Sequence, residues 1–136
     1  MRKIVFLLLM AFVSVNYMTA QDNSEASKRV PEAKFDTLVY NYGKVKESDK
    51  PVKCTFEVEN VGTAPLIIQR VSASCGCTTP EYTKDPILPG EKGKIDVSYD
   101  TKGRVGPINK TITVFTNVPD KVYKLKITGE VIRAKE

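Results

Sequence analysis

The feature that most constrains the fold of this chain is an alternation of apolar and polar residues with a period of two, which recurs between residues 35 and 132. It is clearest over residues 52–59, where the apolar positions are Val52, Cys54, Phe56 and Val58. Successive side chains of a β-strand point to opposite faces, so this pattern indicates a strand with one buried and one solvated face. No comparable stretch with a helical period occurs beyond the N-terminal segment, and we therefore predict an all-β domain.

Turn signals separate the expected strands. Residues 60–65 (Asn-Val-Gly-Thr-Ala-Pro) form one, and Leu88-Pro89-Gly90-Glu91 has the Pro-Gly centre of a type II turn. Short strands divided by regular turns are typical of a β-sandwich. We predict an antiparallel sandwich of about seven strands over residues 35–132, followed by a tail at 133–136. The other expected strands cover residues 35–42, 66–71, 95–99, 108–116 and 123–131.

The N-terminus has the composition of a secretory signal. Arg2 and Lys3 precede an apolar run over residues 4–15, and the small residue Ala20 precedes polar Gln21. An apolar run of about 12 residues is shorter than the roughly 20 that cross a bilayer, which favours a cleaved signal peptide over an uncleaved anchor.

We therefore predict a signal peptide at residues 1–20 and a flexible tether at residues 21–34. No Cys follows the apolar run, which argues against a lipoprotein anchor. The expected location is the periplasm or the outside of the cell, with no membrane span after cleavage.

The composition leaves few catalytic options. The chain has no His, which excludes His-based acid–base catalysis, His-activated nucleophiles and His-containing metal sites. It has 21 basic and 16 acidic residues, and removing Arg2 and Lys3 with the signal leaves 19 against 16, a net charge of +3. No basic cluster with interleaved aromatics is present, so we expect no nucleic-acid binding. Because the chain lacks His, we also expect no enzymatic activity.

The three cysteines carry the one chemical signal. Cys54 lies on the apolar face of its strand and is best interpreted as a small buried hydrophobe. Cys75 and Cys77 lie in the loop sequence Ser-Cys-Gly-Cys-Thr-Thr-Pro, where Gly76 permits unusual backbone angles. Such a pair forms a small disulfide or presents two soft sulfurs to one metal ion.

Several roles for this pair remain open. A structural clamp is favoured, because secretion makes oxidation the expected state. Ring strain in a small disulfide favours thiol–disulfide exchange, and reduced thiolates favour Cu(I), with Cys54 as a candidate third ligand. A bridge from Cys54 to Cys75 or Cys77 is the competing pairing. We favour the local bridge, because Cys54 lies among inward-facing apolar residues.

A series of motifs resembles a known bacterial family. They are Tyr40-Asn41-Tyr42-Gly43-Lys44-Val45, the segments 56–62 and 65–68, Ser74-Cys75-Gly76-Cys77-Thr78-Thr79-Pro80, residues 86–91, Gly106-Pro107 and residues 110–114. Together they resemble the family called domain of unknown function 1573, over about residues 35–131.

The resemblance implies an immunoglobulin-like sandwich related to Hydin and major-sperm-protein domains, which are mostly interaction modules, and it implies no assigned activity. The family motif matches Cys75 and Cys77, with Gly76, Thr78 and Pro80 beside them, and Cys54 is not part of it.

The expected function is that of a secreted or periplasmic, non-enzymatic, Ig-like interaction module that needs no cofactor. Its partner is expected to be a protein or a glycan, and an exposed strand edge is one place where a partner strand pairs. The alternative is a thiol redox or Cu(I)-binding protein that acts through Cys75-Gly76-Cys77.

Overall fold

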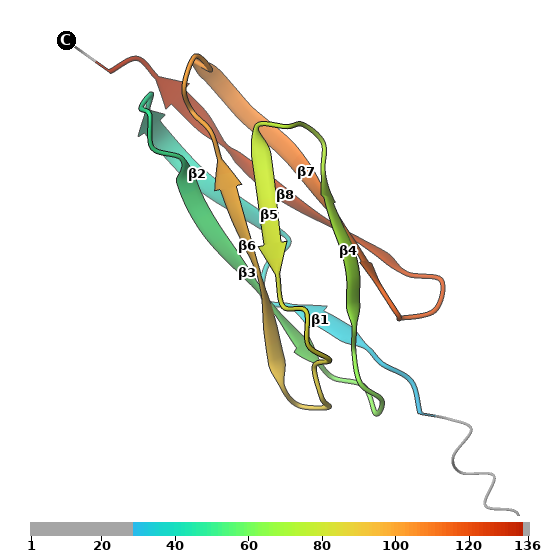
Figure 1. Ribbon diagram of the computed structural model, residues 1–136. Coiled ribbons are helices and arrows are strands. Elements are labelled where there is room, and N and C mark those ends of the chain that lie inside the picture. The colour runs from blue at the N-terminus through green and yellow to red at the C-terminus, as the bar shows by residue number, and fades with distance from the viewer. Residues whose placement is uncertain (1–28, 135–136) are drawn as a thin grey trace, which may run out of the picture.

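The computed structural model describes residues 29–134, so the predicted signal peptide and most of the predicted tether lie outside the described residues. Over this range the chain forms two four-stranded sheets that pack face to face (Figure 1). Sheet A has the strand order β1-β3-β6-β5, and sheet B has the order β2-β8-β7-β4. The strands are β1 (Ala33–Phe35), β2 (Val39–Lys46), β3 (Val52–Asn60), β4 (Ile68–Ala73), β5 (Thr78–Tyr82), β6 (Lys92–Tyr99), β7 (Gly106–Thr116) and β8 (Val122–Ile132).

The predicted all-β sandwich is confirmed, and the period-two pattern selects its core. Phe56 and Val58 on β3 are fully buried, whereas Glu57 between them is exposed. The opposite sheet contributes in the same way, with Leu125 and Ile127 buried and Lys126 exposed. Burial of these apolar side chains stabilises the fold by about 25 cal/mol for each Å² of apolar surface removed from water, and it is the main stabilising contribution of this layer.

The expected number of about seven strands agrees with the eight strands of residues 29–134, but two other details of the predicted architecture are wrong. The sandwich is not wholly antiparallel, because β2 pairs with β8 in parallel. The stretch that we expected to be one strand from residue 35 divides between the sheets, with β1 beside β3 and β2 beside β8. Alternation identifies a strand but not its neighbour, so the sequence pattern could not reveal this division.

The first strand also begins before residue 35, where we expected the domain to start. Residues 30–34, which we assigned to the tether, are hydrogen-bonded to the turn after β3. The carbonyl oxygen of Val30 accepts from Thr63 N–H at 2.8 Å, and that of Glu32 accepts from Val61 N–H at 2.9 Å. These bonds extend the β1–β3 pairing into residues 30–34. This segment lacks the apolar–polar alternation of a strand, so the sequence pattern did not reveal it.

Strand β5 was expected to be loop. It pairs with β6 over Thr78–Tyr82 and includes Pro80, a residue that is depleted in strands. Proline is tolerated here because β5 is an edge strand, so its missing N–H leaves no neighbour unpaired.

The Pro-Gly turn has the predicted form. Gly90 has a φ of 82°, and Glu91 N–H donates to the Leu88 carbonyl oxygen over 2.9 Å. A positive φ at the third position defines a type II turn and favours glycine there.

Among residues 29–134, no helix is long and apolar enough to cross a membrane.

Candidate functional site

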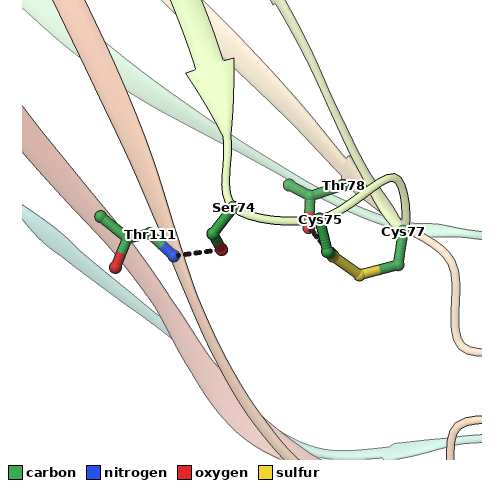
Figure 2. Close-up of a disulfide and its surroundings, with 5 residues drawn as sticks. All are labelled: Ser74, Cys75, Cys77, Thr78 and Thr111. Carbon is green, nitrogen blue, oxygen red and sulfur yellow. Dashed lines mark hydrogen bonds between the residues drawn. A yellow bond between two sulfur atoms is a disulfide. The ribbon is translucent and has the colours of Figure 1, made fainter.

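The Cys75–Cys77 pair forms a disulfide in the connection from β4 to β5 (Figure 2). Its Cα atoms are 5.3 Å apart, and the local pairing is the one that we favoured from the sequence. Cys77 is buried with an exposed fraction of 7%, whereas Cys75 is only partly buried. The two sulfurs therefore differ in access, and Cys75 is the one that an external thiol reaches more easily.

Backbone hydrogen bonds fix this loop to both sheets. Ser74 N–H donates to the Thr111 carbonyl oxygen of sheet B over 3.0 Å, and the Asp100 N–H beyond β6 donates to the Cys77 carbonyl oxygen over 2.9 Å. The loop that carries the disulfide is thus held at one end of the sandwich, between β4 and β5.

The residues around the disulfide differ in importance. Thr78 is buried, and its hydroxyl oxygen lies 3.6 Å from Cys75 Sγ and 3.8 Å from Cys77 Sγ. A disulfide sulfur carries no hydrogen, so the hydroxyl is the donor in these contacts. Gly76 is exposed, its φ is outside the left-handed region, and a Cβ there meets no atom within 4 Å. The backbone at Gly76 therefore does not adopt the unusual angles that a glycine permits.

Cys54 does not join the other two cysteines. It is a buried free thiol on β3, and both it and Pro80 pair with Val97 of the intervening strand. Two strand spacings, roughly 9.6 Å, therefore separate Cys54 from β5, which is beyond the roughly 4.4–6.8 Å between the Cα atoms of a disulfide. Over the described range, no three or more His, Cys, Asp or Glu side chains group to hold a metal ion.

The environment of Cys54 disfavours the thiolate form of its side chain. Burial raises the pKa of its thiol, and the neighbouring Tyr42 hydroxyl offsets only part of this effect. Burial, together with the nearby thiol, also raises the pKa of Tyr42. Because the thiolate is the reactive form, a raised pKa supports the interpretation of Cys54 as a core residue.

The four edge strands each carry a feature that opposes the addition of a partner strand. β1 has three residues, β5 contains Pro80, and β4 has an irregularity between Ile68 and Arg70. In β2 the register shifts between Asn41 and Lys44. Short strands, proline and bulges are the means by which proteins block edge pairing. Partner contact through a strand edge is therefore less favourable than we expected from the sequence.

The outer face of sheet A has charges that pair with one another. Lys92 Nζ lies 3.3 Å from Glu57 Oε2, and Lys94 Nζ lies 3.5 Å from Asp96 Oδ2. The second oxygen of the Asp96 carboxylate accepts a hydrogen bond from Thr55 over 2.6 Å. On this face Lys92 and Lys94 therefore have acidic partners, whereas Lys53 and Glu81 take part in none of the ion pairs within residues 29–134.

The outer face of sheet B is different, because its cations lack such partners. We define the β4–β7–β8 face as the outward residues Arg70, Ser72, Thr111, Thr113, Phe115, Lys124 and Lys126. Within residues 29–134, Arg70, Lys124 and Lys126 take part in no ion pair. The sequence alone does not reveal this face, since the strand register that joins β4, β7 and β8 is needed to place its residues together.

Comparisons with known proteins agree with this fold. A family model described as protein of unknown function (DUF1573) matches residues 33–131. A protein of unknown function from Porphyromonas gingivalis W83 is similar in structure, with a TM-score of 0.64 and 18% identity, over 75% of this chain and 47% of that chain.

Two further structures share the sandwich within larger proteins. A family 123 glycoside hydrolase from Clostridium perfringens has a TM-score of 0.58 and 10% identity, over 77% of this chain and 27% of that chain. The VesB protease of Vibrio cholerae has a TM-score of 0.56 and 13% identity, over 79% of this chain and 33% of that chain. At these identities the similarity extends to the fold alone. The chain spans about half or less of each of these structures, and no curated protein matches it.

Proposed function

This chain belongs to the DUF1573 family, and from that premise we propose that it is a non-enzymatic interaction module that acts in the periplasm or outside the cell. The single observation that carries the proposal is the β4–β7–β8 face, which presents three unpaired cations next to a disulfide-clamped loop. The ion pairs of Lys92 and Lys94 on sheet A, and the features that oppose pairing at the edge strands, favour this face over the other surfaces for contact with a protein or glycan.

The chemistry of the domain supports an interaction role over catalysis. The chain lacks His, and its free thiol is buried with a raised pKa. A rigid sheet with long basic side chains is instead suited to recognition, because charge complementarity directs association and selects partners.

The proposal is tested by cross-linking in envelope extracts of the parent organism, followed by identification of bound proteins and glycans. The wild-type chain is compared with a variant carrying Lys124→Gln and Lys126→Gln. A control variant carries Lys53→Gln and Lys94→Gln, which removes the same charge from the outer face of sheet A. The proposal predicts a specific partner that is retained by the control and lost by the first variant. Equal capture by all three proteins would contradict it.

The export step has its own test. Mass spectrometry of the secreted protein is expected to find Gln21 as the first residue, whereas an intact segment 1–20 would contradict cleavage.

A second candidate function is thiol–disulfide exchange, and the unequal access to Cys75 and Cys77 favours it. A partner thiolate attacks the Cys75 sulfur, the Cys75–Cys77 bond breaks, and Cys77 leaves as a thiolate. A second thiol of the partner then attacks the mixed disulfide, so the partner is oxidised to a disulfide and the pair is reduced to two thiols. The reduced pair supplies soft ligands for Cu(I) in the alternative metal-binding role.

Exchange and metal binding are measured on the purified chain. Rapid exchange with glutathione, or stoichiometric uptake of Cu(I) after reduction, supports the second candidate. A bridge that resists glutathione, with no Cu(I) uptake by the reduced chain, contradicts it and leaves a purely structural clamp.

A further inference from the structure

Strand register arranges the β4–β7–β8 face in rows. Ser72 of β4 lies opposite Thr113 of β7, which lies opposite Lys124 of β8. In the next row, Thr111 of β7 lies opposite Lys126 of β8. Directly paired residues share one face of a sheet. The first row therefore presents two hydroxyl groups beside Lys124, and the second presents one hydroxyl group beside Lys126. Such a row offers donors at two heights, a short hydroxyl and a long ammonium.

The spacing of the two lysines matches an extended peptide. Lys124 and Lys126 are exposed, and Leu125 between them is fully buried, so both ammonium groups project from the same face. Two residues of a strand span about 6.7 Å. A second chain in extended conformation has the same repeat, so acidic side chains at alternate positions meet these lysines in register.

A third cation is held in place on the same face. Arg70 lies opposite Phe115, and its guanidinium carbon is 4.2 Å from the centre of that ring. Contact with the ring restricts the rotamers of the side chain, and the N–H donors of a guanidinium group lie at its edge rather than on the face that contacts a ring. A guanidinium group binds a carboxylate through two parallel hydrogen bonds, which makes Arg70 a suitable anchor for an acidic residue.

Charge on this face is one-sided. The acidic residue of sheet B that follows Lys126 is Glu130, four residues farther along β8 and therefore roughly 13 Å away. Phe115 is covered by Arg70, so this ring does not offer an open surface on which a sugar stacks. Both observations favour a carboxylate-bearing protein segment over a neutral glycan.

We propose that the β4–β7–β8 face binds an extended protein segment that has Asp or Glu at alternate positions and lies along β8. This inference rests on the proposed function, because it names the partner class for the same face. Lys124 and Lys126 each contact a carboxylate of the bound segment, at alternate positions. The hydroxyl groups of Thr111 and Thr113 donate hydrogen bonds to carboxylates of the segment. Arg70 binds a further acidic residue.

The test uses two synthetic peptides of equal composition and charge, acetyl-(Thr-Glu)₅-amide and the block isomer acetyl-Thr₅-Glu₅-amide. Their affinities for the purified chain are measured by NMR titration at low ionic strength. The alternating peptide is expected to bind about threefold more tightly or better, which corresponds to one or two exposed ion pairs. The variant with Lys124→Gln and Lys126→Gln is expected to lose this preference, and the control with Lys53→Gln and Lys94→Gln is expected to keep it.

Three results would overturn the inference. Equal binding of both peptides would contradict the register match. Binding of dextran sulfate through Lys124 and Lys126, without binding of either peptide, would identify an anionic polysaccharide as the partner and leave the proposed function intact. Self-association through this face, detected by sedimentation of wild type against the Lys124→Gln, Lys126→Gln variant, would identify a second copy as the occupant. Failure of the envelope cross-linking experiment would in addition remove the proposed function itself.

Discussion

The side-chain amide of Asn60 donates a hydrogen bond of 2.8 Å to the backbone carbonyl oxygen of Ile87. Asn60 is fully buried at the end of β3, and its amide also donates to the Ala64 carbonyl oxygen over 2.8 Å. Its side-chain oxygen accepts from Gly62 N–H over 2.9 Å. One side chain thus holds the turn after β3 against the segment before β6.

Replacing Asn60 by Ala is therefore expected to destabilise the domain by at least about 2 kcal/mol, because each buried group left without its partner costs about 1–3 kcal/mol. Urea denaturation provides the measurement. Asn109→Ala is the matched control, because Asn109 is exposed, and its effect is expected to stay within about 0.5 kcal/mol. Similar losses for the two variants would contradict the role of Asn60.

The opposite faces of β3 provide a second prediction. Phe56 is fully buried between the sheets, so Phe56→Ala is expected to cost about 3–5 kcal/mol through lost transfer energy and a residual cavity. Lys53 is exposed on the same strand, and Lys53→Ala is expected to cost less than about 0.5 kcal/mol. Calorimetry or urea denaturation of both variants decides, and equal losses would mean that the assigned facing of β3 is wrong.

The disulfide closes a very short loop, so it reduces the conformational entropy of the unfolded chain only slightly. Cys75 and Cys77 are two positions apart, and a loop of this size is expected to stabilise the fold by about 1–2 kcal/mol at most. The double variant with Cys75→Ser and Cys77→Ser is therefore expected to remain folded, with a loss in urea denaturation below about 2 kcal/mol. An unfolded double variant would contradict this estimate. A peptide map without reductant that links Cys54 to this loop would contradict the pairing.

The raised pKa of Cys54 predicts a pH dependence of stability. The folded chain retains the thiol proton that the unfolded chain loses above about pH 8.5, so the free energy of unfolding falls as the pH rises from that value. Burial also raises the pKa of Tyr42 and of Tyr123, but unfolded tyrosine ionises only near pH 10. The window between about pH 8.5 and 10 therefore isolates Cys54.

Urea denaturation across this window is compared for wild type and Cys54→Ala. The wild-type stability is expected to decline more steeply than that of the variant, whatever the difference at pH 7. Parallel curves would show that the thiol has a similar pKa in the folded and unfolded chains.

Sequence patterns predicted the elements whose faces differ in polarity. β3, β6 and β8 alternate buried apolar with outward polar residues, and the turn at Leu88-Pro89-Gly90-Glu91 follows from the backbone freedom of Gly90. β5 was missed because Pro80 interrupts its strand propensity, and only its position at a sheet edge explains why that residue is tolerated.

The candidate site was predictable in one part only. The local disulfide could be predicted from the sequence, because a single residue separates Cys75 from Cys77 and this short separation brings the two sulfurs together. Arg70, Phe115 and Lys124 come from three strands that are distant in the chain, and their common face depends on register. Nothing in the local sequence of any one of these strands indicates the other two.

The central claim, that the β4–β7–β8 face is the interaction surface, is tested most directly by NMR chemical-shift mapping. The alternating acidic peptide, or the partner recovered from envelope extracts, is titrated into the ¹⁵N-labelled chain. The account predicts the largest shifts at Thr111, Thr113, Lys124 and Lys126, with small shifts over the outer face of β3 and β6. Shifts concentrated on β3 and β6, or on the Cys75–Cys77 loop alone, would contradict it.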